Sequence, residues 1–375
     1  MDNQNIPRRI REIREQHGLS QQELADLMGW KSHASIVAIE NGEKNVKIQE
    51  LLKLSSILST PLESFFSETS STSERPTILW RKKAADSKIV LREEYNLIEY
   101  YKNYQLVERL SQTKSLSTKY LPKKTFDIHS DQYKWVNQLA ESIHKDFHLG
   151  DYPAESLIKC LEEEYGVLLI SRPLEEGSAA CYRDESGSVI ILNEKEVRWR
   201  QIFSLAHELF HLITWNEELI SKIQSDETLF NKNESLADAF AAALLMPQTM
   251  INHDVSESKL TYSFIIALAG KYQVSKQAML WRLHHLRFIT KEEVQLALKD
   301  PEFLKFDHEI SKQVFTATSS LGNRFIRLAY LSYENGKLSK TKFARILKVK
   351  LRDLEQYLAE KGLFLTDDKE IRRAC

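Results

Sequence analysis

The sequence has little cysteine and no long apolar run. Its 375 residues include three cysteines, Cys160, Cys181 and Cys375, which are widely spaced and odd in number. Such a set excludes a disulfide framework and fits a reducing compartment. No apolar run approaches the roughly 18–20 residues that cross a bilayer. Residues 1–5 also lack the apolar core of a signal peptide. We therefore expect a cytoplasmic protein without membrane contact.

An excess of charge of one sign is also missing. Lys and Arg number 52 against 53 Asp and Glu, which gives a net charge of −1. Any nucleic-acid contact must therefore come from a local patch, because the chain is not basic as a whole. With 42% hydrophobic and 28% charged residues, the composition is that of a folded globular protein. A chain of this length is expected to hold two or three domains.

The most informative stretch is residues 203–211, which carries His-Glu-x-x-His. Apolar residues at helical spacing, without proline or glycine, predict a helix over residues 202–215. His207 and His211 are four positions apart on it, so both imidazoles lie on one face and aim at one point. Two converging imidazoles suit zinc, and Glu208 is placed to act as a base on a water molecule beside the metal.

A second helix, predicted over residues 233–246, supplies two carboxylates and ends before Pro247. Glu234 and Asp238 are four positions apart and share a face. Glu234 completes a His/His/Glu set that leaves a fourth position open, as catalytic zinc sites do. Asp238 can accept the second ring N–H of a ligand histidine. The alternative, two ordinary amphipathic helices with exposed charges, explains this interlocking set less well.

A small sheet is expected next to these helices. Residues 166–171 are rich in apolar and β-branched side chains, and a hairpin signal separates residues 178–183 from residues 189–193. Helical patterns precede the sheet at residues 132–148 and 153–165. The edge of such a sheet can align an extended peptide by main-chain pairing.

The N-terminal 67 residues predict a compact helical unit. Its helices are expected at residues 6–16, 21–28, up to about 40, and 48–58. Ser20 and Glu23 form a capping box at the start of the second helix. The unit carries eight Lys and Arg against nine Asp and Glu, so it is not basic as a whole.

This unit resembles the phage-repressor-like, XRE-type helix-turn-helix family. The matching stretches are Gly18-Leu19-Ser20-Gln21-Gln22-Glu23-Leu24-Ala25, Ile39-Glu40-Asn41-Gly42 and Leu51-Leu52-Lys53-Leu54. The resemblance implies DNA binding, with Gln21 bracing the DNA backbone and four candidate base-contacting residues, Lys31, Ser32, His33 and Ser35. The turn and third helix are one residue longer than the usual pattern. Protein–protein docking is the alternative.

Residues 68–128 predict a linker and helical connector. Small polar residues and a proline occupy residues 67–78, and a long helix is expected over residues 89–110. This helix carries an aromatic stripe made of Tyr95, Tyr100, Tyr101 and Tyr104. The stripe is either a packing face or a dimer contact. Helix-turn-helix proteins that read two half-sites are dimers, so a homodimer stays an open expectation.

The second half of the chain resembles the ImmA/IrrE metallopeptidase family. The matching stretches are residues 191–193, 200–211, 233–241 and 245–247. The resemblance implies a gluzincin-like metalloendopeptidase with His207, His211 and Glu234 as ligands of Zn²⁺, or alternatively Mn²⁺, and Glu208 as general base. Members of the family typically cleave a partner repressor. Phe210 stands where a glycine is usual and is expected to narrow the space beside the metal.

The part of the chain after Pro247 is expected to be helical. Residues 256–298 form a helix-turn-helix-like pair that the family also shows, and a further helical region follows. Over residues 319–375, Lys and Arg number thirteen against seven Asp and Glu. A second nucleic-acid contact and a docking or sensing module are both open for this region.

The sequence therefore predicts a mostly helical α+β fold: an all-α helix-turn-helix unit, a zincin-like metallopeptidase domain with a small β-sheet, and a helical C-terminal region. The expected segments are residues 1–67, 68–128, 129–255, 256–298 and 299–375. The predicted function is cleavage of a partner repressor or regulatory protein, encoded nearby, by a DNA-associated zinc endopeptidase that thereby controls transcription. The alternative is a transcriptional regulator whose peptidase fold senses a ligand or binds a partner without proteolysis. A second oxyanion donor is left open among Tyr182, Arg183, Arg198, Tyr262, His284 and His285.

Overall fold

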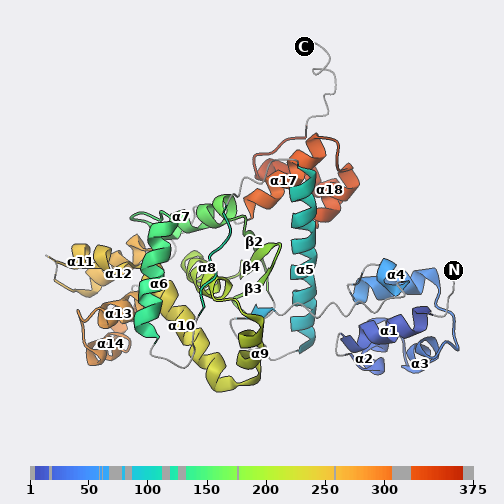
Figure 1. The fold of residues 1–375 in the computed structure, drawn as a ribbon, viewed down its shortest axis with the longest axis horizontal. Helices are drawn as coiled ribbons and strands as arrows, with labels where there is room; N and C mark the ends of the chain where they lie inside the picture. Colours follow the sequence, from blue (N-terminus) through green and yellow to red (C-terminus); the bar gives the residue numbers. More distant parts are fainter. Residues whose placement is uncertain are drawn as a thin grey trace, which may run out of the picture. The chain divides into compact units, whose positions relative to one another are not determined.

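The structure is a computed structural model (Figure 1), which describes most of the chain. The described residues are 5–16, 19–58, 60, 62–66, 78–80, 87–111, 119–125, 132–174, 177–256, 259–305 and 322–365. The chain divides into two compact units, Met1–Pro76 with Ala84–Glu99, and Thr77–Lys83 with Tyr100–Cys375. Each unit has its own hydrophobic core and is described by itself.

The first unit is built from short helices around one apolar core. They are α1 (Asn5–Gln16), α2 (Gln21–Leu27), α3 (Ala34–Glu40), α4 (Ile48–Ile57) and the 3-10 turn η1 (Leu62–Phe65). The predicted capping box at α2 is confirmed, because Ser20 accepts from the Glu23 N–H while the Glu23 carboxylate accepts from the Ser20 N–H. The left-handed Gly29 (φ +71°) begins the turn from α2 to α3.

A buried ion pair joins the first and third helices of this unit. The guanidinium of Arg14 donates to both carboxylate oxygens of Glu40, at 2.6 and 3.0 Å, and the Glu40 side chain has no exposed surface. Arg14 also donates to the Leu19 carbonyl. The two-point contact fixes the angle between α1 and α3.

The second unit contains a four-stranded sheet. Its strands are β1 (Leu79–Trp80), β2 (Leu168–Arg172), β3 (Ala179–Asp184) and β4 (Gly187–Asn193), in the order β1-β3-β4-β2. β3 and β4 form the predicted hairpin, and β2 pairs with β4 in parallel. β4 is central and almost wholly buried, as expected for a strand covered on both faces.

Helices surround this sheet (Figure 1). Those in the first part of the unit are α6 (Tyr133–Asp146), α7 (Pro153–Lys159), the π turn η2 (Cys160–Glu164), α8 (Arg198–Ile213), α9 (Glu217–Ser225) and α10 (Glu227–Leu245). α8 packs against β3 and β4, and α10 crosses both α8 and α6. The sheet therefore supports α8, and α10 lies on the other side of α8 from the sheet.

The remaining helices follow α10. They are α11 (Gln248–Val255), α12 (Tyr262–Lys271), α13 (Lys276–His285), α14 (Lys291–Ala297), α15 (Pro301–Lys305), α17 (Asn323–Glu334), α18 (Lys340–Ile346), η3 (Leu351–Asp353) and α19 (Leu354–Glu360). α12 and α13 contribute to the same core as the sheet. In the described part of the chain, no helix is both long and apolar enough to span a membrane.

The aromatic stripe lies on α5 (Ser87–Leu110) and serves as a packing face. Tyr101 and Tyr104 are each 3% exposed. The Tyr101 hydroxyl donates to Asp184 at 2.7 Å, and the Tyr104 ring packs against Phe325. These two rings therefore pack within the second unit, and a homodimer stays a prediction; the side chain of Tyr95 lies outside the described residues.

The prediction of a mostly helical α+β fold with a small sheet is confirmed. Element ends differ: α8 begins at Arg198 and α10 at Glu227, both earlier than predicted. β1 was missed, because a two-residue strand beside linker-like sequence gives no periodic signal. The exact boundaries of the five segments stay predictions.

Candidate metal centre

Helix α8 supplies three polar side chains to the core of the second unit. His207, Glu208 and His211 are 1%, 0% and 3% exposed, and the apolar residues on both sides of them in the helix are buried as well. One helical turn separates the two histidines, and their ring centroids lie 4.9 Å apart. Buried polar groups on a rigid helix are held in fixed positions, which a metal or catalytic site requires.

Helix α10 supplies the opposing groups. Asp226 caps its N-terminus by accepting from the N–H groups of Thr228 and Leu229. The fully buried Ala237 and Ala241 let α10 approach its neighbours closely. As a result, Glu234 on α10 faces both histidines of α8.

Three side chains, His207, His211 and Glu234, bring their donor atoms together in a cluster that we call the donor triangle, in which the two carboxylate oxygens of Glu234 each face one histidine. The Nε2 atoms of His207 and His211 are 3.1 Å apart. Glu234 places Oε2 at 3.3 Å from His207 Nε2 and Oε1 at 3.2 Å from His211 Nε2. Within the part of the chain that the structure describes, these residues form one potential metal-binding group.

The triangle fits a tetrahedral metal ion. With metal–nitrogen and metal–oxygen bonds of roughly 2.0–2.1 Å, tetrahedral ligands lie roughly 3.3 Å from one another. The three measured separations agree with that value to within about 0.2 Å. Two imidazoles and one carboxylate also match the donor types of open zinc sites. The residues present therefore fit the ion that the sequence predicts.

The charge of the site also favours a cation. Burial lowers the pKa of His207, but hydrogen bonds to Asp238 and Glu234 outweigh it and raise this pKa to about 9. Burial raises the pKa of Glu234, but the two histidines outweigh it and lower this pKa to about 2. The carboxylates of Glu234 and Asp238 therefore stabilise a positive charge at the histidines, and a proton or a metal ion can supply this charge.

Both histidines are oriented from behind. Asp238 Oδ1 lies 2.8 Å from Nδ1 of His207, as the sequence predicted. Nδ1 of His211 lies 3.2 Å from the amide of Asn233, which is 3% exposed. Each ring therefore has one nitrogen held by a partner and the other at the donor triangle.

Asn233 was missed by the sequence reasoning. It directly precedes Glu234, so it lies on an adjacent face of α10 and not on the i, i+4 row of Glu234 and Asp238. The available signal was a buried-type position occupied by an amide at the start of an apolar helical run. A polar residue there requires a partner.

Glu208 is a fully buried carboxylate beside the triangle. Neither of its oxygens has a well-aligned hydrogen-bond donor among the described residues. Burial raises the pKa of Glu208, and the two histidines and the thiol of Cys181 oppose that rise. Burying a carboxylate without a full set of hydrogen-bond partners lowers the stability of the fold. Catalytic bases are often buried groups of this kind.

Cys181 is a buried, protonated neighbour of this carboxylate. It lies on β3 and has no exposed surface. Burial and the negative charge of Glu208 raise the pKa of Cys181 well above its ordinary value. In this structure the thiol is therefore a small packing group next to Glu208.

Phe210 packs between the core and the candidate site. Its side chain is fully buried, and its ring centroid lies 5.6 Å from that of Phe240 on α10 and 5.7 Å from that of His211. The phenylalanine that replaces the usual glycine therefore contacts one of the two candidate histidine ligands. The expectation that it narrows the space beside the metal stays a prediction.

Most of the candidate oxyanion donors have other partners. Arg183 donates to the carbonyls of Leu121 and Leu212, which ties β3 to the end of α8. The hydroxyls of Tyr182 and Tyr262 donate to Asp184 and Asp300, and His284 contacts the Ile289 carbonyl. The structure assigns no second oxyanion donor from this set.

The edge of the sheet nearest the metal centre is already paired. β1 lies antiparallel to β3, with Leu79 opposite Cys181 and Trp80 opposite Ala180. Leu79 is 5% exposed and belongs to the core. A peptide can therefore pair with β3 only after β1 has moved.

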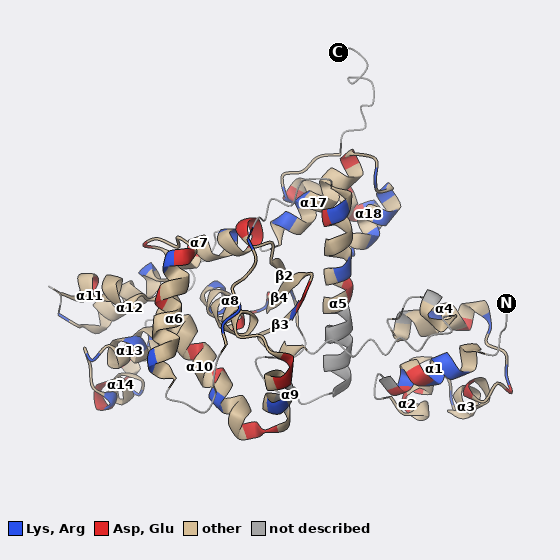
Figure 2. Ribbon diagram, in the orientation of Figure 1, with Lys and Arg blue, Asp and Glu red and all other residues tan. Residues whose placement is uncertain are grey.

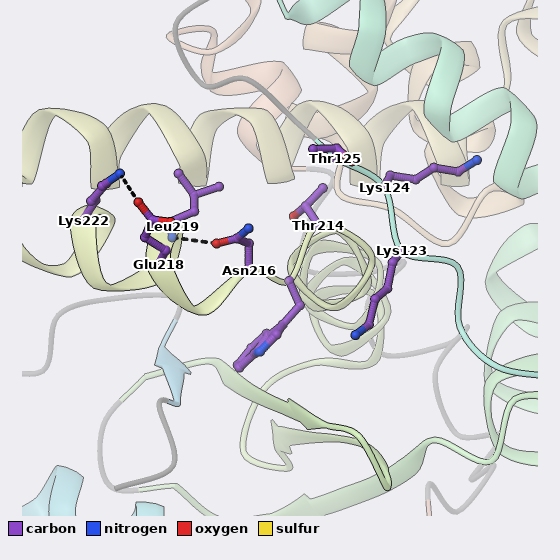
Figure 3. A pocket seen from close by; sticks show the side chains of 9 residues that line it. Lys123, Lys124, Thr125, Thr214, Asn216, Glu218, Leu219 and Lys222 are labelled. Atoms are coloured by element: carbon purple, nitrogen blue, oxygen red, sulfur yellow. Dashed lines mark hydrogen bonds and ion pairs between the residues drawn. The ribbon is translucent and has the colours of Figure 1, made fainter. Parts of the chain in front are cut away.

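A pocket of about 450 Å³ lies beyond the carboxyl end of α8 (Figure 3). Its lining residues come from the end of α8, from α9 and from the segment before α6: Lys123, Lys124, Thr125, Thr214, Trp215, Asn216, Glu218, Leu219 and Lys222. Lys222 is paired with Glu218 at 2.7 Å, on the side of the pocket that α9 forms. The pocket includes none of the three donor residues.

The candidate DNA-contacting residues lie in the first unit. Lys31, Ser32 and His33 are exposed at the start of α3, and Ser35 is partly exposed. The Gln21 amide donates to Glu40 at 2.8 Å, so in this structure it braces the buried ion pair. His33 and Gln22 are linked by a hydrogen bond of 2.9 Å.

The fold and the site can now be compared with known proteins. The first unit contains short helices in a helix-turn-helix arrangement, and the second is an α+β unit with a buried His/His/Glu group. Comparison with known families agrees with both parts. Residues 10–65 match the family described as helix-turn-helix. Residues 162–284 match the peptidase family described as IrrE N-terminal-like domain.

Two curated relatives match the second unit. The radiation response metalloprotease IrrE of Deinococcus deserti is 30% identical over 122 residues, which are 32% of this chain and 43% of that protein. The protein of the same name from Deinococcus radiodurans is 32% identical over 104 residues, 27% of this chain and 32% of that protein. The chain thus spans less than half the length of these relatives.

Among solved structures, a Mycobacterium tuberculosis transcriptional regulator matches with 14% identity and a TM-score of 0.32. The match covers 48% of this chain and 51% of the other. A score this low supports no conclusion about fold or function.

Proposed function

We propose that this chain is a DNA-associated, zinc-dependent endopeptidase that cleaves a repressor or regulatory protein encoded nearby and so controls transcription. The observation that carries the proposal is the donor triangle of His207, His211 and Glu234 with the buried Glu208 next to it. This combination would bring a bound metal and a base to one point, which supports hydrolysis of a peptide bond.

Zinc is the metal that the donor set favours, with manganese as the alternative. Imidazole and carboxylate ligands suit zinc, and manganese prefers more oxygen ligands than this site offers. Bound zinc supplies Lewis acidity, which activates water near neutral pH and polarises the scissile carbonyl.

Glu234→Ala is expected to lower metal content after dialysis, whereas Glu227→Ala, at an exposed position of the same helix, is expected to leave it unchanged.

The protein's own groups carry the proton transfers. Glu208 takes a proton from the attacking water and passes it to the amine that leaves. Asp238 and Asn233 hold the rings of His207 and His211 from behind. The raised pKa of Glu208, caused by burial, brings this base closer to the pH at which general bases work best.

The helix-turn-helix domain supports a regulatory target. The two curated relatives are named as metalloproteases of the radiation response, and a regulator is the natural substrate for a peptidase attached to such a domain. We propose that the first unit binds DNA through Lys31, Ser32, His33 and Ser35, with Gln21 bracing the interface. Phosphate contacts would then position α3.

Glu208→Gln tests the peptidase proposal. Glutamine keeps the shape but cannot take a proton, so the variant is expected to retain metal and to lose cleavage of the neighbouring repressor by at least about 100-fold. The assay incubates purified protein with that repressor, with and without chelator, and follows the products by mass spectrometry. Glu227→Gln is the matched control.

A regulator without proteolysis is the second candidate, and the paired sheet edge favours it. β1 covers the strand with which an extended substrate would pair. If the metal-loaded wild type leaves the repressor intact and Glu208→Gln behaves identically in cells, this second function holds and the peptidase proposal is wrong.

A further inference from the structure

The turn of the helix-turn-helix domain has a definite backbone pattern. Trp30 N–H donates to the Ala25 carbonyl at 2.9 Å, and Gly29 between them has a left-handed backbone (φ +71°). Ala25 is fully buried, where a larger side chain would separate the helices. Ile36 on the next helix is also fully buried and completes the core of the motif.

The same turn recurs near the C-terminus. Val349 N–H donates to the Ala344 carbonyl at 3.0 Å, and Lys348 has a left-handed backbone (φ +55°). A lysine in this conformation costs roughly 1 kcal/mol, so the turn imposes it. Leu354 on the following helix is fully buried. The turn is a common type of helix end, and α17, α18 and α19, which lie on both sides of it, are here called the C-terminal module.

The turn between α12 and α13 has the same hydrogen-bond pattern. Val274 N–H donates to the Ala269 carbonyl at 3.0 Å, and Gln273 is left-handed (φ +51°). Two cations of α13 point inward: Lys276 donates to the Phe303 carbonyl and Arg282 to the Met246 carbonyl. Both side chains are about 95% buried, so they add little to the surface charge.

The C-terminal module is different because its cations face outward. Residues 337–352 contain seven Lys and Arg and no Asp or Glu. These cations are Lys337, Lys340, Lys342, Arg345, Lys348, Lys350 and Arg352, and Figure 2 shows Lys and Arg gathered over α18 and the adjoining turns. All are exposed except Lys340, which is partly exposed.

Several of these cations have no acidic partner. Lys340 pairs with Glu355 at 2.6 Å, and Lys348 lies over the Tyr100 ring. Lys342, Arg345 and Lys350 make no ion pair with any residue that the structure describes. Lys342 and Arg345 are three positions apart on α18 and share a face. Lys340 and Arg352 have acidic partners, Glu355 and Asp353, but the cations of residues 337–352 outnumber the acids beside them, and such a surface attracts a polyanion.

We propose that residues 337–352 form a second DNA-contacting surface, which binds the phosphate backbone of duplex DNA without reading its sequence. Asp353 precedes α19, and α19 carries Glu355 and Glu360. Carboxylates on this helix oppose its entry into the major groove of DNA. Backbone contacts from α18 and its turns need no base readout. This surface therefore adds affinity, and α3 of the first unit remains the element that distinguishes sequences.

The test is a salt titration of DNA binding by the full-length protein. A fluorescein-labelled duplex of mixed sequence is titrated with wild type and with K342Q/R345Q/K350Q at several NaCl concentrations, and fluorescence anisotropy is read. Each lost phosphate contact reduces the slope of log K against log[salt] by about 0.9. The variant is expected to lose at least 10-fold in affinity and about 2 to 3 in slope.

K134Q/K145Q/K299Q is the matched control, because it removes the same charge from three exposed positions outside the module. It is expected to keep the wild-type affinity and slope. A second pair of proteins carries Lys31→Gln and His33→Ala, with and without the C-terminal triple change. Residual binding in the first and its loss in the second separate this surface from the N-terminal domain.

The proposal is overturned if the C-terminal triple variant matches the control in both affinity and slope, which would assign the basic surface to a protein partner. It is also overturned if the loss depends on DNA sequence. Far-UV circular dichroism and metal content check that each variant is folded. Failure of the Lys31 and His33 changes to weaken binding would count against the N-terminal interface alone.

Discussion

Asp238 Oδ1 lies 2.8 Å from Nδ1 of His207, and the other nitrogen of that ring lies 3.3 Å from Glu234 Oε2. An imidazole whose Nδ1–H donates to a carboxylate has its Nε2 lone pair free for a metal. Asp238 thus selects the ligating tautomer of His207 from a position that is itself half exposed.

Asp238→Ala is expected to weaken metal binding by about 10- to 100-fold, because His207 then loses both its tautomer preference and its orientation. Asp238→Asn keeps an acceptor oxygen and is expected to lose less. Competition with a chromophoric chelator measures the affinities. Equal affinities for wild type and Asp238→Ala would show that Asp238 is a surface residue without a role in metal binding.

Asn233 is expected to play the same part for His211. In the structure the amide nitrogen of Asn233 lies 3.2 Å from Nδ1 of His211. A ring that binds metal through Nε2 donates from Nδ1, so metal binding requires the Asn233 amide in the opposite orientation, with its oxygen as the acceptor. Asn233→Asp retains that oxygen and is expected to hold metal nearly as well as wild type. Asn233→Ala is expected to lose about 10-fold in the same chelator assay. A loss of the same size in both variants would contradict the acceptor role.

The ion pair of Arg14 and Glu40 is expected to dominate the stability of the first unit. Arg14→Met removes the two-point cationic partner of the buried Glu40 carboxylate and leaves it with Gln21 and the more distant Arg11, which should destabilise the unit by about 3 kcal/mol. The double change Arg14→Met/Glu40→Leu should recover most of that loss, since it removes the charge as well. Hydrogen exchange of α1–α3 amides in urea measures the free energy of unfolding.

Arg8→Met on the same helix is the control, because the Arg8 and Glu12 side chains are 55% and 30% exposed. Its effect is expected to stay below about 1 kcal/mol. A double variant as unstable as Arg14→Met alone would mean that packing, and not the unpaired charge, sets the loss.

The sequence predicted the grouping of these side chains because their spacing is local. His207 and His211 fall on one face of a helix for geometric reasons alone, and so do Glu234 and Asp238. Whether the histidine pair of α8 meets the carboxylate pair of α10 depends on how the two helices pack. The alanines of α10 indicate close packing but do not specify the partner helix. Asn233 could not be assigned a partner until the crossing of α8 and α10 was known.

Non-local relationships explain what was missed. β1 exists only because β3 offers a paired edge to Leu79 and Trp80, and nothing in two residues encodes this. The aromatic residues of α5 were ambiguous for the same reason: Tyr101 finds Asp184 across the fold. The turns at Gln273 and Lys348 were also not predictable, because these residues are left-handed without being glycine, the residue that usually marks such a backbone.

Glu162 provides the contact whose pH dependence is most readily predicted. It lies in η2, is 6% exposed, and accepts the backbone N–H groups of Arg324 and Gly322 at the start of α17. Burial raises the pKa of Glu162 to about 7; Glu163 adds to the rise, and the backbone N–H groups and Arg327 oppose it. Docking of α17 therefore depends on a carboxyl that titrates near neutrality.

The folded-state pKa of Glu162 lies above the ordinary value of 4.5, so the protonated form is favoured by folding. The resulting stabilisation is fully present below pH 4.5 and is lost as the pH rises to about 7, a change on the order of 3 kcal/mol. Hydrogen exchange of α17 amides, corrected for intrinsic rates, should show weaker protection at pH 8 than at pH 6. Glu162→Gln should remove this difference, whereas Glu164→Gln, at an exposed pair with Lys119, should keep it. A wild-type response that persists in Glu162→Gln would place the titrating group elsewhere.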